Sequence, residues 1–220
     1  MIEKQMVDNR QSRGYLLELF AGSRSVGSEA EAMGMEVFSV DWQKFDKINL
    51  AKDIGALILN DVPFIPDVIW ASPDCTTYTI AAISTHRNGT EPKSDYAKKC
   101  DQVNVHFIGL IKEWLKLNPN MVFFIENPRG MLRKMPFMQE FKRHTIWYCQ
   151  YGDDRAKPTD IWTNSKTWKP RPVCHNGNKN CHHTPAPRGS KTGTQGRKGS
   201  YERSKIPQGL CREILGSACW

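Results

Sequence analysis

Residues 16–27 read LLELFAGSRSVG. The apolar start is typical of a buried strand, and a helical pattern follows over Ser25–Met33. Small residues around Gly22 lie between the two, and they let the backbone approach a ligand closely, while the N-terminus of a following helix favours negative charge. Many strand-to-helix turns need glycine only for packing, so this turn has to be judged together with its neighbours.

A second strand pattern extends this unit. Residues Glu36–Val40 lead into Asp41-Trp42, and Asp53-Ile54 come before the next strand. An acidic residue at the end of the second strand of such a unit accepts hydrogen bonds from ribose hydroxyls. The order of strand, glycine turn, helix, strand and acid therefore predicts a cofactor that contains a nucleoside, without identifying it.

Two further apolar runs end in reactive side chains. Asp67–Ala71 is followed by Ser72-Pro73-Asp74-Cys75, and Met121–Ile125 by Glu126-Asn127-Pro128. A single cysteine is more often a small buried apolar residue than a nucleophile, and the charge of Asp74 disfavours a thiolate. The pairing with Glu126 outweighs both points, because ligands gather at the carboxyl edge of parallel strands, where a thiol and a carboxyl group can combine attack with proton transfer.

The alternation of strands and helices predicts an α/β fold with a doubly wound, mostly parallel sheet. Strands are expected at Tyr15–Ala21, Glu36–Val40, Asp67–Ala71, Met121–Ile125, His144–Gln150 and Asp160–Thr163, and helices at Ser25–Met33, Asp53–Leu59, Cys100–Leu117 and Gln208–Cys219. The segment Thr79–Lys99 has no clear period, and it begins four residues after Cys75. We expect it to be mobile and to close over a bound substrate as a lid.

In the order of these motifs the chain resembles the cytosine-C5 DNA methyltransferases, and more narrowly their short phage or prophage-type members. The resemblance covers nearly the whole chain, although Asp74 and Thr76 flank the cysteine where the family usually has Pro-Cys-Gln. The matching segments are Phe20-Ala21-Gly22, Asp41, Asp53, Pro73-Asp74-Cys75, Glu126-Asn127, Tyr151-Gly152 with Lys157-Pro158-Thr159, and Ile206–Ile214.

The resemblance implies the methyltransferase version of the predicted fold and S-adenosylmethionine as the cofactor. It implies transfer of a methyl group to C5 of a flipped cytosine through a covalent adduct with Cys75. Glu126 and Lys157 complete the implied catalytic set, and Asn127, Arg155 and Thr159 are the implied substrate contacts. The implied cofactor contacts are Phe20, Ala21, Gly22, Asp41, Trp42, Asp53, Ile54, Ser72 and Pro73.

Two other functions remain open at this point. In an amino-methyltransferase, Ser72-Pro73-Asp74 would bind an exocyclic amine and Cys75 would be incidental. A non-catalytic DNA-binding protein that retains the cofactor fold is the second alternative. A covalent complex with DNA that contains 5-fluorocytosine separates these functions, since only addition of a thiol to C6 traps it.

The positive charge is concentrated in one segment. Residues 165–205 hold ten of the 31 Lys and Arg residues but one of the 23 acids, so the rest of the chain is close to neutral. We expect residues 165–205 to be a small basic insert that recognises double-stranded DNA, and residues 1–164 with 206–220 to form the catalytic domain. The charge of this segment indicates phosphate and base-edge contacts, and we favour that interpretation over a solvated surface loop. The expected DNA contacts are Arg188, Lys191, Gln195, Arg197 and Lys198.

The insert also contains potential zinc ligands. Thiolate and imidazole groups bind Zn²⁺, and a small segment with few apolar residues gains stability from a metal. The candidates are Cys174, Cys181 and His182, with Cys149 as a possible fourth ligand. The spacing of the cysteines is wider than is common, and the alternative is a set of polar DNA contacts with partly buried cysteines.

Composition sets the remaining expectations. The longest apolar stretch falls short of the roughly 18 residues that a membrane span needs, and the N-terminus lacks the apolar region of a signal peptide. With seven cysteines, at least one is unpaired within a monomer. We therefore expect a monomeric cytoplasmic protein, of a bacterium or of a phage-infected cell, that has no membrane partner.

Overall fold

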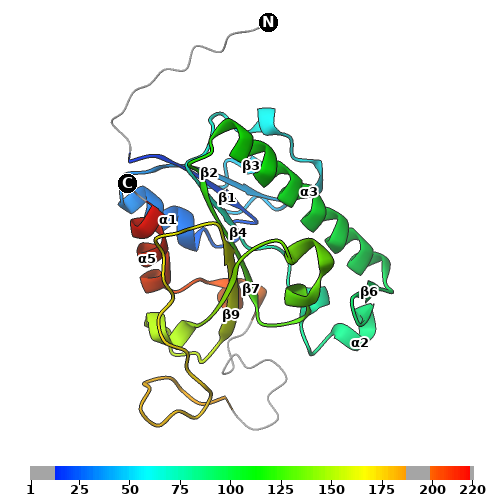
Figure 1. The fold of residues 1–220 in the computed structure, drawn as a ribbon, viewed down its shortest axis with the longest axis vertical. Helices are drawn as coiled ribbons and strands as arrows, with labels where there is room; N and C mark the ends of the chain where they lie inside the picture. The colour runs from blue at the N-terminus through cyan, green and yellow to red at the C-terminus, as the bar shows by residue number, and fades with distance from the viewer. Residues whose placement is uncertain (1–12, 187–198, 219–220) are drawn as a thin grey trace, which may run out of the picture.

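The computed structural model describes residues 13–186 and 199–218, and a seven-stranded sheet forms its centre (Figure 1). The strand order is β3-β2-β1-β4-β7-β9-β8, in which β9 alone runs antiparallel to its neighbours. This confirms the predicted doubly wound, mostly parallel α/β fold. The bounds are β1 Tyr15–Leu19, β2 Glu36–Asp41, β3 Leu50–Ala51, β4 Val68–Ala71, β7 Val122–Pro128, β8 Arg143–Trp147 and β9 Pro158–Thr163.

Helices cover both faces of the sheet, because neighbouring strand residues point to opposite sides. Leu17 of β1 belongs to an apolar core with the buried side of α3, Asp95–Leu117. Leu16 belongs to a second core with α1, Ser25–Ala32, and α5, Gln208–Ala218. Figure 1 shows α1 and α5 side by side, with α3 on the other side of the sheet.

The remaining elements are short. A two-stranded antiparallel ribbon of β5 and β6 follows the short helix α2, and most of the other elements are single 3₁₀ turns. Their bounds are η1 Ile54–Ala56, η2 Leu59–Asp61, η3 Thr76–Tyr78, α2 Ile83–His86, β5 Arg87–Asn88, β6 Glu91–Pro92, η4 Met131–Lys134, η5 Pro136–Met138, η6 Tyr148–Tyr151 and α4 Ser200–Ser204.

Several predicted boundaries shift for local reasons. Strand β1 ends at Leu19 because Phe20 has a φ of 56°, which no strand residue adopts. Strand β7 runs three residues beyond the predicted end, because Glu126, Asn127 and Pro128 pair with β9. Strand β8 ends at Trp147, and the rest of its predicted length is the 3₁₀ turn η6.

The predicted helix at Asp53–Leu59 is wrong. The side chain of Asp53 accepts a hydrogen bond from the Gly55 backbone and begins the short turn η1. Leu57 then takes an extended conformation and buries its side chain completely in the core. Burial of this leucine therefore overrides the local tendency to continue the helix.

The predicted lid, Thr79–Lys99, contains more regular structure than expected. Its last part is the first turn of α3, which begins at Asp95 because Ser94 caps it by accepting a hydrogen bond from Ala97 N. Its centre is held by Arg87, which is buried and pairs with Asp101 of α3 at 2.6 Å. This partly buried ion pair ties the segment to the helix.

None of the helices among the described residues combines the length and the apolar character that a lipid bilayer crossing requires.

Candidate active site

The two reactive strand ends meet at the carboxyl edge of the sheet. Strands β4 and β7 pair in register up to Ala71 and Ile125, so the residues that follow are neighbours. The side chain of Asn127 donates a 2.8 Å hydrogen bond to the carbonyl oxygen of Pro73, two residues before Cys75. The Oδ1 atom of Asn127 is buried and has no hydrogen-bond partner among the described residues. This edge thus places a free acceptor close to the cysteine.

The loops beyond these strands also pack tightly. Gly130 lies so close to the loop after Cys75 that a Cβ atom at this position would stand 2.4 Å from the carbonyl oxygen of Tyr78. Only glycine allows this approach without a backbone shift. The contact keeps the cysteine loop against the loop that follows Glu126 and Asn127.

Glu126 is buried and held by an aromatic residue that sequence reasoning missed. The hydroxyl of Tyr148 donates a 2.9 Å hydrogen bond to Glu126 Oε1. The Nζ atom of Lys157 lies 4.7 Å from the centre of the Tyr148 ring, within cation–π range. Burial lowers the pKa of Lys157, whereas the charges of Glu126 and Cys75 raise it. Lys157 is therefore close enough to both groups to act on them electrostatically.

Cys75 is partly buried, and the pKa of its thiol is well above that of a free cysteine. Burial raises its pKa to about 11, with Asp74 and Glu126 adding to the increase and Lys157 opposing it. Asp74 is fixed beside the thiol, since it accepts a 2.6 Å hydrogen bond from Thr76 N and another from the Tyr96 hydroxyl. Asp74 thus acts on the thiolate in the direction that the sequence predicts, and Lys157 is the main opposing charge.

The glycine turn at the end of β1 has an unusual backbone. Phe20, Gly22 and Arg24 have φ angles of 56°, 47° and 52°, so the chain coils left-handedly three times within five residues. Asp41, at the end of β2, accepts a 2.9 Å hydrogen bond from Gly22 N through Oδ2. The indole of the next residue, Trp42, is 69 % exposed.

A buried acidic network beneath this turn was also missed. Glu18 accepts a 3.0 Å hydrogen bond from Gly27 N and a 2.8 Å bond from Ser39 Oγ, and the Nε atom of Arg24 lies 4.0 Å from it. Burial is the largest influence and raises the pKa of Glu18 to about 7. The sequence signal was the acidic residue in the middle of an otherwise apolar strand.

The other predicted cofactor contacts lie either beside the glycine turn, at the ends of β1 and β4, or farther along the chain, after β3. Ala21 N donates to Val40 O at 3.2 Å and Ser72 N donates to Leu19 O at 3.3 Å, so the ends of β1, β2 and β4 are joined. Asp53 sits one element farther on, where its carboxylate pairs with Lys99 at 2.8 Å. Ile54, the next residue, is buried. Predicted contacts at this edge are Phe20, Ala21, Gly22, Asp41, Trp42, Ser72 and Pro73.

Two of the predicted substrate contacts are placed differently from the expectation. Arg155 is completely buried, pairs with Asp153, and donates to the carbonyl oxygens of Arg203 and Lys205 at 3.1 and 3.0 Å. Its guanidinium group thus holds the chain that leads into α5 and has no surface left for a base or a phosphate. Thr159 is also completely buried, on β9 between β7 and β8.

The predicted insert is described only in part. Arg188, Lys191, Gln195, Arg197 and Lys198 lie outside the described residues. Near Cys149, the structure brings His183, rather than the predicted His182, to Cys174 and Cys181. The ring of His182 instead lies 3.0 Å from the carbonyl oxygen of Asp153 and is exposed.

No protein-family model matches the chain, and no curated protein sequence does. Among solved structures, the chain is similar to a DNMT2 variant of Spodoptera frugiperda, with 19 % identity over 78 % of this chain and 57 % of that one, and a TM-score of 0.48. It is also similar to the Dnmt2 methyltransferase of S. pombe, with 13 % identity over 73 % of this chain and 52 % of that one, and a TM-score of 0.47. A third is precorrin-6y C5,15-methyltransferase of Geobacter metallireducens GS-15, with 12 % identity over 70 % and 81 % of the two chains and a TM-score of 0.40. The chain spans little more than half the length of the first two.

Proposed function

We propose that the chain is an S-adenosylmethionine-dependent methyltransferase that acts on C5 of cytosine in double-stranded DNA. The observation that carries this proposal is the proximity of Cys75, Glu126 and Lys157, which come from three separate segments, at the carboxyl edge of the sheet. A thiol, a carboxyl group and an amine at one point suit nucleophilic addition combined with proton transfer.

The cofactor part of the proposal rests on the turn after β1. Its left-handed backbone at Gly22 leaves no side chain in the way of a ligand, and the helix α1 begins directly after it. The two oxygens of Asp41 accept from Gly22 N and Gln43 N, and each keeps a second lone pair as the proposed acceptor for ribose hydroxyls, while the exposed indole of Trp42 offers a flat apolar surface to a purine ring. These residues fit S-adenosylmethionine, which supplies an electrophilic methyl group when bound.

The chain's own residues then activate the base. The Cys75 thiol passes its proton to the Glu126 carboxylate and its sulfur bonds to C6 of cytosine, while the electron pair of the C5–C6 double bond shifts between C5 and C4 and the C4–N3 pair moves onto N3. Glu126 donates a proton or a hydrogen bond to N3, which makes C5 nucleophilic. After methylation, water takes the C5 proton, the C5–C6 double bond re-forms, and the Cys75 sulfur leaves and recovers the N3 proton through Glu126.

Lys157 has a defined task in this sequence. Because burial raises the pKa of Cys75 to about 11, forming its thiolate at neutral pH requires free energy. The ammonium group of Lys157 reduces that cost, and the hydroxyl of Tyr148 keeps the carboxyl group of Glu126 in place. The unpaired Oδ1 of Asn127 offers an acceptor to the bound base.

The observed hydrogen bonds favour C5 over an exocyclic amine as the target. In an amino-methyltransferase the segment Ser72-Pro73-Asp74 would bind the amine. Here the Pro73 carbonyl already accepts from Asn127, and both oxygens of Asp74 accept from Thr76 and Tyr96. These bonds fix the orientation of the segment and occupy one lone pair of each acceptor, so fewer acceptor sites are free for an amine.

The choice of DNA rests on the charge of residues 165–205. An excess of Lys and Arg suits phosphate contacts, and the target atom of a duplex cytosine becomes accessible only when the base is flipped. Arg188, Lys191, Gln195, Arg197 and Lys198 are the proposed contacts. We retain residues 165–205 as the proposed recognition insert of one catalytic domain.

The decisive experiment is covalent trapping. Duplex DNA with 5-fluorocytosine is incubated with the full chain and S-adenosylmethionine, and the adduct is detected on a denaturing gel. Fluorine at C5 cannot leave as a proton does, so we expect a stable adduct with the wild type and with the buried-cysteine control Cys211→Ser. We expect none with Cys75→Ser, which should still bind the cofactor in calorimetry.

Other results would overturn the proposal in distinct ways. Methylation of the exocyclic amine without an adduct would indicate an amino-methyltransferase, and DNA binding with neither product would indicate a non-catalytic protein. An adduct that forms only with 5-fluorocytidine in RNA would contradict the DNA substrate. Glu126→Gln provides a second check, because an amide cannot protonate N3, and turnover within a few-fold of the wild type would exclude this role.

A further inference from the structure

Four potential metal ligands from two distant segments meet beside the insert. Cys149 lies in η6, whereas Cys174, Cys181 and His183 lie in the loops of the insert. Their ligand atoms, one from each side chain, all lie within 4.8 Å of one another. In residues 13–186 and 199–218 this is the one group of three or more such side chains compact enough to hold an ion.

The separations suit a small tetrahedral ion. With Zn–S bonds near 2.3 Å and Zn–N bonds near 2.0 Å, a sulfur and a nitrogen ligand of a tetrahedral zinc site lie about 3.5 Å apart. The Sγ atom of Cys174 and the Nδ1 atom of His183 are 3.9 Å apart, close to that edge length. Three thiolates with one imidazole are also a common ligand set of structural zinc sites.

Most of the cluster is buried, and its imidazole lacks a partner that burial demands. Cys149, Cys174 and His183 are each at least nine-tenths buried, and all three cysteines are free of disulfide bonds. The Nδ1 atom of His183 meets only the sulfur of Cys174, at 3.9 Å, and its Nε2 atom has no hydrogen-bond partner among the described residues. A buried imidazole beside three thiols is costly unless something binds them.

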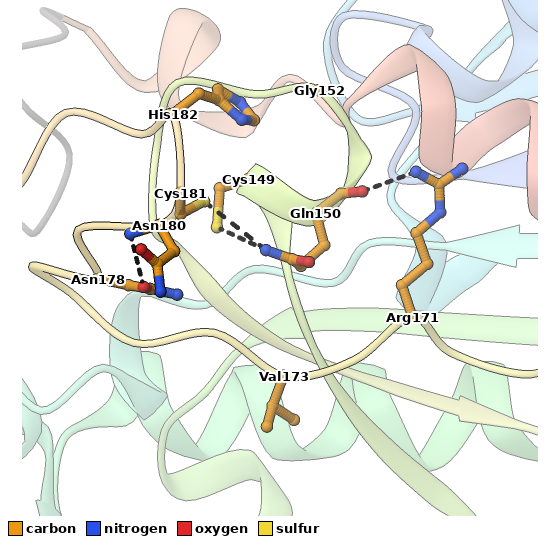
Figure 2. A pocket seen from close by; sticks show the side chains of 9 residues that line it. All are labelled: Cys149, Gln150, Gly152, Arg171, Val173, Asn178, Asn180, Cys181 and His182. Carbon is orange, nitrogen blue, oxygen red and sulfur yellow. Dashed lines mark hydrogen bonds between the residues drawn. The ribbon is translucent and has the colours of Figure 1, made fainter.

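Amide groups surround the sulfur atoms in the way that metal-bound thiolates require. The Nε2 atom of Gln150 lies 3.7 Å from Cys181 Sγ and 3.9 Å from Cys149 Sγ, as Figure 2 shows. The Nδ2 atom of Asn178 donates to Cys174 Sγ at 3.4 Å. Hydrogen-bond donors of this kind stabilise the negative charge of thiolate ligands from the second layer around a metal.

The surrounding segment is anchored at its start by Trp168 in the second core and by Arg171, which pairs with Glu213, but it has little regular structure of its own. Residues 164–186 contain no helix or named strand, and the apolar cluster at this point consists of four buried residues with Cys181 at its edge. A segment without its own apolar core gains much of its order from a metal. The segment that lacks an apolar core of its own is therefore also the one that supplies most of the potential metal ligands.

We propose that Cys149, Cys174, Cys181 and His183 bind one structural Zn²⁺ ion that fastens the insert to the turn η6. This turn also carries Tyr148, whose hydroxyl holds Glu126. The ion would thus set the position of the insert relative to the reactive residues. The inference does not depend on the proposed function, since a zinc site can order this segment in a protein of any activity.

The test is the metal content of the full chain, purified under reducing conditions and without a metal-binding tag. Elemental analysis is expected to find about one zinc ion per chain. The histidine pair provides a matched comparison, because His183→Ala should lose most of the zinc while the adjacent His182→Ala keeps it. Cys174→Ser should lose it too, whereas Cys100→Ser in α3 should not.

A second measurement avoids the risk that a variant fails to fold. Removal of the metal from the wild-type chain with a chelator should lower its melting temperature, and added Zn²⁺ should restore it. Replacement by Co²⁺ should give the intense visible absorption of a tetrahedral cobalt thiolate. A wild-type chain that is folded, with seven titratable thiols and no bound metal, would overturn the proposal. So would iron in place of zinc, or loss of zinc with His182→Ala but not with His183→Ala.

Discussion

The hydroxyl of Tyr148, in the turn η6 that follows β8, donates a 2.9 Å hydrogen bond to Glu126 Oε1 of β7, although β9 lies between β7 and β8 in the sheet. The same aromatic ring supports the ammonium group of Lys157. One tyrosine therefore contacts two of the three charged side chains that act on Cys75. Burial and the neighbouring Glu126 charge raise the pKa of Tyr148, so the phenol remains a donor throughout the physiological range.

The first prediction concerns this hydroxyl. Tyr148→Phe keeps the ring beneath Lys157 but removes the donor to Glu126. Hydrogen bonds to charged groups contribute about 1.5–3 kcal/mol, so turnover should fall roughly ten- to a hundredfold with the fold intact. Methyl incorporation and thermal melting measure the two effects, with Tyr201→Phe, an exposed tyrosine, as the control. Turnover within twofold of the wild type would leave Tyr148 a packing residue.

The second prediction concerns the acidity of Cys75. Asp74→Asn removes a negative charge that raises the pKa of this thiol, so the pKa should fall below about 11 and alkylation by iodoacetamide at pH 8 should become several-fold faster. Lys157→Met should act in the opposite direction. Mass spectrometry of the Cys75 peptide over a pH series measures both rates.

A matched control for this experiment is Asp95→Asn, which removes one exposed carboxylate at the start of α3. It should leave the Cys75 rate unchanged. If Asp74→Asn and Asp95→Asn had the same effect, the shift would come from net charge and not from the contact at the strand end.

The third prediction concerns the pH dependence of stability. The folded chain keeps the proton of Glu18 up to about pH 7, whereas the unfolded chain releases it near pH 4.5. The contribution of Glu18 is therefore fully present below pH 4.5 and is lost as the pH rises through about 7, by on the order of 3 kcal/mol. Glu18→Gln should remove this part of the pH dependence in urea unfolding.

The exposed carboxylate of Glu36 offers the control for this pH series, since Glu36→Gln should leave the wild-type profile intact. Parallel profiles for the wild type and Glu18→Gln between pH 4.5 and 8 would show that Glu18 is ionised in the folded chain.

The fourth prediction concerns the cofactor. Asp41→Asn keeps one acceptor oxygen for the turn but loses the second, so binding of S-adenosylmethionine should weaken by about tenfold through the loss of roughly one hydrogen bond. Calorimetry measures the affinity, and Asp46→Asn, an exposed acid in the following turn, should bind normally. Unchanged affinity in Asp41→Asn would move the pocket away from this edge.

The fifth prediction concerns the insert. Each phosphate contact contributes about 0.9 to the slope of log affinity against log salt concentration. Arg197→Ala with Lys198→Ala should therefore flatten the salt dependence of DNA binding by up to about 2. The pair Lys112→Ala with Lys116→Ala removes the same charge from α3 and should leave the slope as it is. Equal slopes for both double variants and the wild type would place the DNA surface elsewhere.

Local patterns in the sequence by themselves determined most of the strands and helices of the sheet domain, and they identified the reactive residues at its edge. The alternation of apolar strands with helices, and the breaks after Ala71 and Gly22, follow from backbone chemistry that acts within a few residues. These signals were sufficient to predict a doubly wound sheet with Cys75 and Glu126 at one edge. The Ser94 cap, also a local signal, was present in the sequence and was missed.

Only the tertiary structure decided which long-range partners these residues have. Leu57 is extended and not helical because its side chain is buried in the core. Arg155 is buried and holds the chain before α5 because Asp153 and the carbonyl groups of two distant residues surround its guanidinium group. His183 and not His182 joined the cysteines because neighbouring side chains point in different directions. Such choices depend on the shape of the packed chain, where burial penalises every unpaired polar group, and no local pattern encodes that geometry.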